Sequence, residues 1–278
     1  MQDQKLDNLL NLAMDATPEE REKSRNLNVG YNEETRLWDV IVKYSGSDEG
    51  LSGDGITTVL LQGGYAVVTL PEAEIDAYTD RQQVEFVEKP KRLYFQLFQE
   101  KEASCIRSVQ AGRNGLTGRG ILVGVVDSGV DFFHPDFRNA DGTTRILKLW
   151  DQSIPGNPPE GYRIGTEYTK EEINEALALP ETEGRRLIPS VDLSGHGTAV
   201  LGIAAGNGRA SNGVNQGVAY ESDILVVKLG VPREDSFPRT TELIQGIDYL
   251  VRQALILKRP MVINISFGNN YGSHEPCN

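Results

Sequence analysis

The sequence has only two cysteines and no long apolar run. These features argue against a disulfide-stabilised protein and against a membrane-spanning one. Its two cysteines, Cys105 and Cys277, lie far apart in 278 residues and cannot form a disulfide framework, which fits either a reducing compartment or two incidental thiols. No apolar stretch approaches the roughly 20 residues needed to cross a bilayer. The first residues lack the basic start and apolar core of a secretory signal peptide. We therefore expect a cytoplasmic protein with no membrane partner.

Positive charge and histidine are also scarce. Lysine and arginine total 28 against 40 Asp and Glu, and the net charge of −12 argues against nucleic acid as a partner. The three histidines, His134, His196 and His274, form no H-E-x-x-H motif, so a catalytic zinc site is not expected. The glycine-rich stretch 115–120 precedes an apolar strand, whereas dinucleotide-binding glycines follow one. These absences disfavour zinc and nucleotide chemistry.

The first third of the chain mixes short helices with strands. An apolar face at 6–13 and a capping box that begins at Thr17 predict two helices, and a third is expected over 71–78. Strands are expected over 37–44, 56–61, 65–70 and 84–88. The run Lys89-Pro90-Lys91-Arg92 combines charge with a proline and is typical of the start of a linker. We therefore predict a small α+β domain over residues 1–96.

The rest of the chain follows a different pattern. Short, nearly continuous apolar runs predict strands buried on both faces of a parallel sheet, over 121–126, 224–229 and 261–265. Helices are expected over 197–205 and 240–258, and alternating strands and helices predict a doubly wound α/β domain over 97–278. Residues 138–190 are rich in Pro, Gly and charge, which predicts a long surface excursion with one helix over 170–179.

Two motifs could carry chemistry. Asp127 follows the apolar run 121–126, which places a carboxylate at the carboxyl end of a parallel strand, where α/β sheets bind their ligands. An ordinary β–α turn would show the same residues. His196 lies between Gly195 and Gly197 at the start of an apolar helix, and the glycines would leave room for a substrate backbone to approach the imidazole. A tight helix start with an incidental histidine is the alternative.

A third motif, Asn-x-Ser-x-Gly over 264–268, ends the strand at 261–265. Taken in chain order, the D-S-G of Asp127, the H-G-T of His196 and this motif resemble the subtilisin-like serine proteases. The segments Gly217-Val218-Ala219 and His134-Pro135-Asp136 resemble the same family. Residues 1–96 resemble the family's α+β prodomain, a chaperone and inhibitor, and are most similar to the Csp-type subtilases of clostridia and their relatives.

The resemblance implies a subtilisin-like doubly wound parallel sheet, present in part, and a serine endopeptidase with an Asp-His-Ser triad. Asp127 would orient His196, and His196 would be the base that activates the serine. Ser266, Phe267 and Gly268 would pair with the substrate backbone. No cofactor is required. Subtilases commonly bind calcium, so a structural calcium ion near Asp136 or the loop 207–216 is possible, but the spacing of that loop departs from the family's and a solvated turn is the favoured reading.

The resemblance also implies partners and a setting. The partners would be a protein or peptide substrate and the chain's own prodomain. The Csp-type likeness implies activation of a spore-cortex hydrolase during germination, and hence an association with spores. Residues 93–98 are mostly large and apolar and lead into a polar stretch, as expected of a prodomain tail lying in the active-site cleft. We expect self-cleavage next to Gln96, with the prodomain remaining bound. The alternative is an edge strand of the prodomain that is never cut.

The sequence departs from the family in one respect. The nucleophile motif G-T-S-x-A and the later oxyanion asparagine are absent from the 278 residues. We expect the serine to lie in a part of the protein missing from this chain, so that the chain alone is inactive. The alternative is a pseudoprotease or fragment that acts as a binding and regulatory module. A downstream G-T-S motif would decide for the enzyme.

Overall fold

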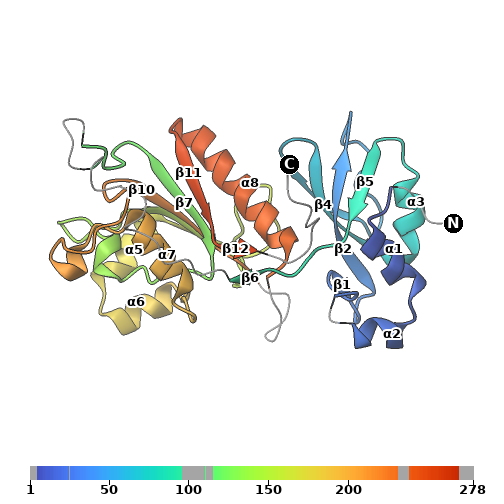
Figure 1. The fold of residues 1–278 in the computed structure, drawn as a ribbon, viewed down its shortest axis with the longest axis horizontal. Coiled ribbons are helices and arrows are strands. Elements are labelled where there is room, and N and C mark those ends of the chain that lie inside the picture. Colours follow the sequence, from blue (N-terminus) through green and yellow to red (C-terminus); the bar gives the residue numbers. More distant parts are fainter. Residues whose placement is uncertain (1–4, 25, 96–109, 111–114, 231–237, 269–278) are drawn as a thin grey trace, which may run out of the picture. The chain divides into compact units, whose positions relative to one another are not determined.

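The computed structural model describes residues 5–24, 26–95, 110, 115–230 and 238–268 (Figure 1). The chain forms two compact units. The first unit comprises residues 1–94, 235–245 and 268–278, and the second comprises 95–234 and 246–267. Each unit has its own buried core. The predicted domain boundary after residue 96 lies outside the described residues and stays a prediction.

The first unit is an antiparallel sheet with helices, as the sequence predicts. Its strands are β1 (Tyr31–Asn32), β2 (Leu37–Tyr44), β3 (Thr57–Leu61), β4 (Tyr65–Pro71) and β5 (Val84–Glu88). They run in the order β1-β2-β4-β3, and β5 also pairs with β2. The helices are α1 (Asn8–Asp15), α2 (Pro18–Lys23), η1 (Glu72–Glu74) and α3 (Ile75–Thr79). Leu10, Trp38 and Tyr78 are fully buried at the centre of the core.

The start of α2 follows the sequence closely. The backbone N–H of Thr17 donates to Glu20 Oε2 at 2.9 Å, and the N–H of Glu20 donates back to Thr17 Oγ1 at 3.3 Å. This reciprocal pair is the capping box that the sequence predicts, and it satisfies backbone groups that a helix start otherwise leaves unpaired.

The segment expected to begin a linker is instead part of the first unit. Lys89 is buried, and its ammonium group donates to the carbonyl of Asn26 at 2.5 Å. The N–H of Thr240 donates to Lys91 O at 3.0 Å, and the N–H of Leu93 donates to Pro238 O at 2.9 Å. The prediction of a linker that begins at 89–92 is therefore wrong at this point. The sequence did not reveal these contacts, because the partners of residues 89–93 are distant in the chain.

An ion-pair network also lies in the first unit. The guanidinium of Arg239 pairs with Asp39 Oδ2 at 2.9 Å and with both carboxylate oxygens of Glu242. Asp39 Oδ1 accepts a hydrogen bond from Thr69 Oγ1 at 2.6 Å. The two carboxylates outweigh the effect of burial and raise the pKa of Arg239. The network joins β2 and β4 to the beginning of α8 (Thr240–Leu257).

The second unit is built on a mostly parallel sheet, which confirms the predicted α/β class. Its strands are β7 (Leu122–Asp127), β8 (Ile146–Asp151), β9 (Thr166–Thr169), β10 (Asp223–Lys228) and β11 (Met261–Ile265). They run in the order β11-β7-β10-β8-β9, and β9 alone is antiparallel to its neighbour in this sheet. The remaining elements are η2 (Pro135–Phe137), α5 (Lys170–Ala178), α6 (Glu181–Leu187), α7 (His196–Ala205) and η3 (Arg209–Ser211).

Helices cover both faces of this sheet (Figure 1). On one face, α7 and α5 pack against alternate residues of β7, among them Val123 and Val125. On the other face, α8 approaches so closely that a Cβ atom at Gly124 would stand 2.9 Å from Leu250 Cδ1. Successive side chains of β7 point to opposite faces of the sheet, and each face is covered by helices. The strand is therefore apolar at nearly every position.

The predicted surface excursion over 138–190 is wrong in part. The helix expected over 170–179 is present as α5, but the excursion also contains α6 and two strands of the central sheet, β8 and β9. Trp150 of β8 is fully buried. Lys148 interrupts the apolar pattern of β8, and its ammonium group pairs with Glu167 of β9 at 2.7 Å. The sequence did not predict β8 because Lys148 interrupts its apolar pattern, and the residue that pairs with Lys148 comes from another strand.

A separate two-stranded sheet pairs β6 (Tyr94–Phe95) with β12 (Phe267–Gly268). Gln96, Cys105, His274 and Cys277, which figure in the sequence predictions, lie outside the described residues. Among the helices that the structure describes, none combines the length and the apolar character that crossing a membrane would demand.

Candidate functional site

Asp127 and His196 meet in the second unit, as their motifs suggested. Asp127 is the last residue of β7, and His196 is the first residue of α7. The imidazole Nδ1 lies 2.7 Å from Asp127 Oδ1, and both side chains are buried. Residues 69 positions apart thus form a short carboxylate–imidazole pair at the carboxyl end of a parallel strand.

Gly197 permits this pairing. A Cβ atom at position 197 would stand 2.2 Å from the carbonyl oxygen of Gly129 and 3.1 Å from Asp127 Oδ1. The space beside Gly197 is therefore filled by the chain itself, and the expectation that this glycine leaves room for a substrate is wrong. Gly195 differs, because its φ is +71° and open space surrounds its Cβ position. Room for a substrate at Gly195 stays a prediction.

The carboxylate of Asp127 is held by few groups. Burial raises its pKa, while hydrogen bonds from His196 and from the Ser128 N–H oppose that rise. Ser128 N donates to Oδ1 at 2.7 Å, the same oxygen that faces the imidazole. The other oxygen, Oδ2, is buried and has no hydrogen-bond partner among the described residues. A carboxylate that accepts from Nδ1 leaves Nε2 as the basic nitrogen of neutral imidazole.

Asp192 is a residue of this region that the sequence reasoning missed. Its Oδ1 accepts hydrogen bonds from Ser128 Oγ at 2.8 Å, Gly195 N at 3.0 Å and Ser194 Oγ at 3.2 Å. Its Oδ2 accepts from Thr198 N at 2.9 Å and from Thr198 Oγ1 at 2.7 Å. The available signal was an acidic residue four positions before the histidine, within Val191-Asp192-Leu193-Ser194-Gly195.

The predicted substrate-binding residues follow β11. Ile265 of β11 lies opposite Val126 of β7, so Ser266 comes next to the sheet edge where Asp127 lies. Ser266 Oγ donates to Asn264 Oδ1 at 2.8 Å. Phe267 and Gly268 form β12, which pairs with β6. The structure therefore places the three residues on an extended segment, and their contact with a substrate stays a prediction.

Asp136, the position at which the resemblance allows a calcium ligand, is held by protein hydrogen bonds. Asp136 Oδ1 accepts from Ala210 N at 2.7 Å, and its carbonyl oxygen accepts from Arg145 Nη1 at 2.9 Å. Within the described ranges, no group of three or more His, Cys, Asp and Glu side chains is arranged to hold a metal ion. A structural calcium ion therefore gains no ligand set from these residues.

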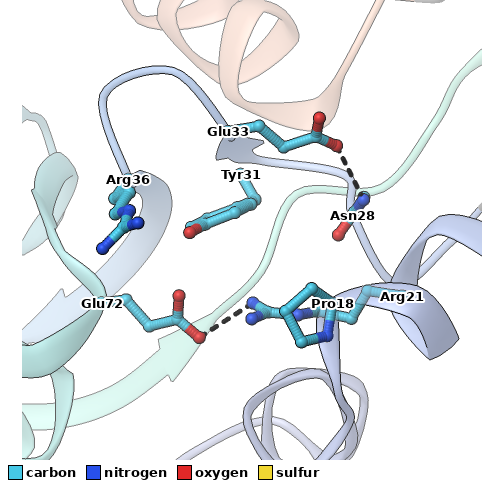
Figure 2. Close-up of a pocket in the computed structure, with 7 residues that line it drawn as sticks. All are labelled: Pro18, Arg21, Asn28, Tyr31, Glu33, Arg36 and Glu72. Atoms are coloured by element: carbon cyan, nitrogen blue, oxygen red, sulfur yellow. Dashed lines mark hydrogen bonds and ion pairs between the residues drawn. The ribbon is translucent and has the colours of Figure 1, made fainter.

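A cavity of about 470 Å³ lies in the first unit (Figure 2). Its lining is Pro18, Arg21, Asn28, Tyr31, Glu33, Arg36 and Glu72. Within it, Arg21 pairs with Glu72 at 2.8 Å, and Asn28 Nδ2 donates to Glu33 Oε1 at 3.1 Å. Because two arginines are balanced by two glutamates, the lining selects no ligand by net charge.

Comparison with known families divides the chain in the same way as its sequence does. The family described as Csp protease B prodomain matches residues 4–91, and the Subtilase family matches residues 118–277. The prodomain match confirms the Csp-type resemblance inferred from residues 1–96.

Similar proteins include a subtilisin from a Bacillus species, 26% identical over 79% of this chain and 45% of the relative. The major intracellular serine protease of Bacillus subtilis is 30% identical over 53% of this chain and 35% of the relative. The solved structure of the Clostridium perfringens CspB protease is 41% identical, with a TM-score of 0.53, over 62% of this chain and 33% of that protein. The chain spans less than half the length of these relatives.

Proposed function

Because this chain belongs to the subtilase family, we propose that it supplies two members of the catalytic triad of a serine endopeptidase: His196 as the general base and acid, and Asp127 as the carboxylate that orients it. One observation carries the proposal: the buried pair of His196 Nδ1 and Asp127 Oδ1 at 2.7 Å, at the carboxyl end of β7. A pair with this geometry makes imidazole an effective base, since the carboxylate stabilises the imidazolium that forms.

Each residue has a defined task in the proposed reaction. His196 takes the proton from a serine hydroxyl, which is otherwise a weak nucleophile, and then gives it to the leaving amine. Asp127 keeps the Nδ1 proton on the imidazole and holds the ring in place. The 278 residues contain no G-T-S-x-A motif, so the nucleophile of the proposed reaction would come from residues outside this sequence.

The substrate would bind as an added strand. Ser266, Phe267 and Gly268 would offer backbone donors and acceptors to an extended peptide, a mode that tolerates many side chains. The pairing of β12 with β6 supports this part of the proposal, because it shows that the segment accepts a neighbouring strand. β6 ends at Phe95, next to Gln96, and we propose that this tail is the first peptide cleaved.

The proposed biological role, in spore germination, rests only on the similarity to Csp-type proteases. The Csp protease B prodomain match supports a Csp-type protease. Action on a spore-cortex hydrolase precursor, the spore-associated or cytoplasmic location and retention of the prodomain remain parts of the proposal. A binding or regulatory pseudoprotease is the second candidate, and a G-T-S-x-A motif in the part of the protein beyond these 278 residues would exclude it. The intact Asp127–His196 pair favours the enzyme, because a binding module has no need of that pair.

The test uses the longest natural polypeptide that contains this chain. His196→Ala and Asp127→Ala should each lower peptidase turnover by about 10⁴ to 10⁶ without unfolding the protein. His134→Ala is the control, since His134 lies outside the pair and accepts a hydrogen bond from Asp136 N. A fluorophosphonate should label the serine of the long protein but not the 278-residue chain. Unchanged hydrolysis by the His196→Ala variant would refute the assignment.

A further inference from the structure

One carboxylate, that of Asp192, holds both sides of the Asp127–His196 pair. On the strand side, it accepts a hydrogen bond from Ser128 Oγ at 2.8 Å, and Ser128 N in turn donates to Asp127 Oδ1. On the helix side, it accepts from Gly195 N at 3.0 Å and from Thr198 N at 2.9 Å. These two amides flank His196 in the chain. Asp192 thus joins the end of β7 to the first turn of α7.

Two serine hydroxyls complete the connection. Ser128 Oγ accepts from Gly197 N at 3.0 Å and lies 2.9 Å from Ser194 Oγ. Ser194 Oγ in turn accepts from His196 N at 3.1 Å. The backbone amides of residues 195 to 198 therefore all donate, directly or through one hydroxyl, into a group centred on Asp192. The first turn of α7 is oriented by this group.

The chemistry requires a carboxylate at this place. Gly195 N faces Oδ1 and Thr198 N faces Oδ2, and a backbone N–H can only donate. An asparagine side chain would turn an NH₂ group towards one of these donors and could satisfy only the other. Burial raises the pKa of Asp192, but the hydrogen bonds from Thr198, Ser128 and Ser194 outweigh it and lower the pKa overall. The residue is therefore ionised near neutral pH.

We propose that Asp192 is a positioning residue, which fixes the imidazole of His196 against Asp127 by binding Ser128 on one side and the amides of Gly195 and Thr198 on the other. The inference rests on the proposed function, because it assigns Asp192 a part in the same site. Asp192 acts on the imidazole through these neighbours, since the imidazole Nδ1 itself faces Asp127 Oδ1.

The test uses the 278-residue chain and needs no peptidase activity. In the proposed pair, His196 Nδ1 carries a proton that donates to Asp127, and NMR of protein with ¹⁵N-labelled histidine detects this proton and its exchange with water. In Asp192→Asn, that exchange should accelerate by about tenfold or more, the factor that corresponds to losing one hydrogen bond. Asp141→Asn is the matched control, because Asp141 accepts from Thr143 N and Oγ1 but lies outside this group.

The outcomes separate the two proposals. A wild-type chain with no protected Nδ1 proton would refute the Asp127–His196 pair itself, and the role of Asp192 with it. A proton that is protected equally in wild type and Asp192→Asn would refute Asp192 alone, even if the variant melts at a lower temperature. If Asp192→Asn does not fold, Ser128→Ala tests the strand side, since it removes the link from Asp192 towards Asp127. Unchanged exchange in that variant would also overturn the proposal.

Discussion

The carbonyl oxygen of Gly129 lies 2.2 Å from the place where a Cβ atom at Gly197 would stand. A real Cβ atom cannot occupy that position, so the turn after β7 and the first turn of α7 approach as closely as two backbones can. Because Asp127 immediately precedes this turn and His196 is the first residue of α7, this close approach also brings the carboxylate near the imidazole.

We predict that Gly197→Ala destabilises the second unit by about 1 to 3 kcal/mol, the usual cost of overpacking. Gly202→Ala is the control, because Gly202 lies in the same helix and its Cβ position is empty within 4 Å. That variant should be as stable as wild type or up to about 1 kcal/mol more stable, since alanine is the better helix former. Urea unfolding followed by Trp150 fluorescence in a Trp38→Phe background measures both, and equal stability of the two variants would contradict the close approach.

Lys89 should make the stability of the first unit depend on pH. Burial lowers its pKa from 10.5 to about 8. Between these values the unfolded chain holds a proton that the folded chain lacks, so the free energy of unfolding rises with pH from about 8 to 10.5. The full rise attributable to this residue is about 3 kcal/mol.

Lys89→Met should lack this rise. Lys43→Met is its control, because Lys43 also donates to a carbonyl oxygen, that of Gly63, but from the surface. Urea unfolding at several pH values, followed by Trp38 fluorescence in a Trp150→Phe background, compares the variants. A pH dependence of Lys89→Met that matches wild type would show that Lys89 does not titrate in this range.

We predict a strong coupling between Arg239 and Asp39 in the first unit. Arg239 is nearly buried between Asp39 and Glu242, so removing its charge leaves carboxylates without their partner. Breaking a buried pair typically costs about 3 to 5 kcal/mol. A double-mutant cycle with Arg239→Met and Asp39→Asn should give a coupling above about 1 kcal/mol.

The matched exposed pair is Arg119 and Glu221, at 2.7 Å, in which the arginine side chain is 80% exposed. Arg119→Met and Glu221→Gln should show a coupling of about 0 to 1 kcal/mol, as is usual for surface pairs. Equal coupling in the two cycles would mean that burial does not strengthen the Arg239–Asp39 contact.

We predict self-cleavage next to Gln96 in the full-length enzyme. β6 ends at Phe95 and pairs with β12, the segment proposed to bind substrate backbone. N-terminal sequencing of the mature large fragment measures the cleaved bond, and the His196→Ala variant should remain uncut. A mature fragment that begins well outside residues 93–104, or an uncut chain in the active enzyme, would contradict this junction.

The sequence by itself determined the local elements and the motif residues. Apolar runs without alternation predicted the strands now observed as β7, β10 and β11, and the helical pattern predicted α8 to within one residue. These segments are readable because a strand covered on both faces must be apolar throughout. The pairing of Asp127 with His196 was expected from two short motifs, since the carboxyl ends of parallel strands gather functional side chains.

Tertiary structure alone decided the features whose partners are distant in the chain. Lys148 breaks the apolar pattern of β8, and only the fold shows that it pairs with Glu167 of the neighbouring strand. Lys89 suggested a linker, and only the fold shows that its ammonium group is buried against the carbonyl oxygen of Asn26. The only signal for Asp192 was its place four residues before His196, and its role became visible only through donors from both sides of the Asp127–His196 pair. A charged residue shows its chemistry only when the fold brings its partner within about 3 Å, and neither composition nor periodicity encodes that distance.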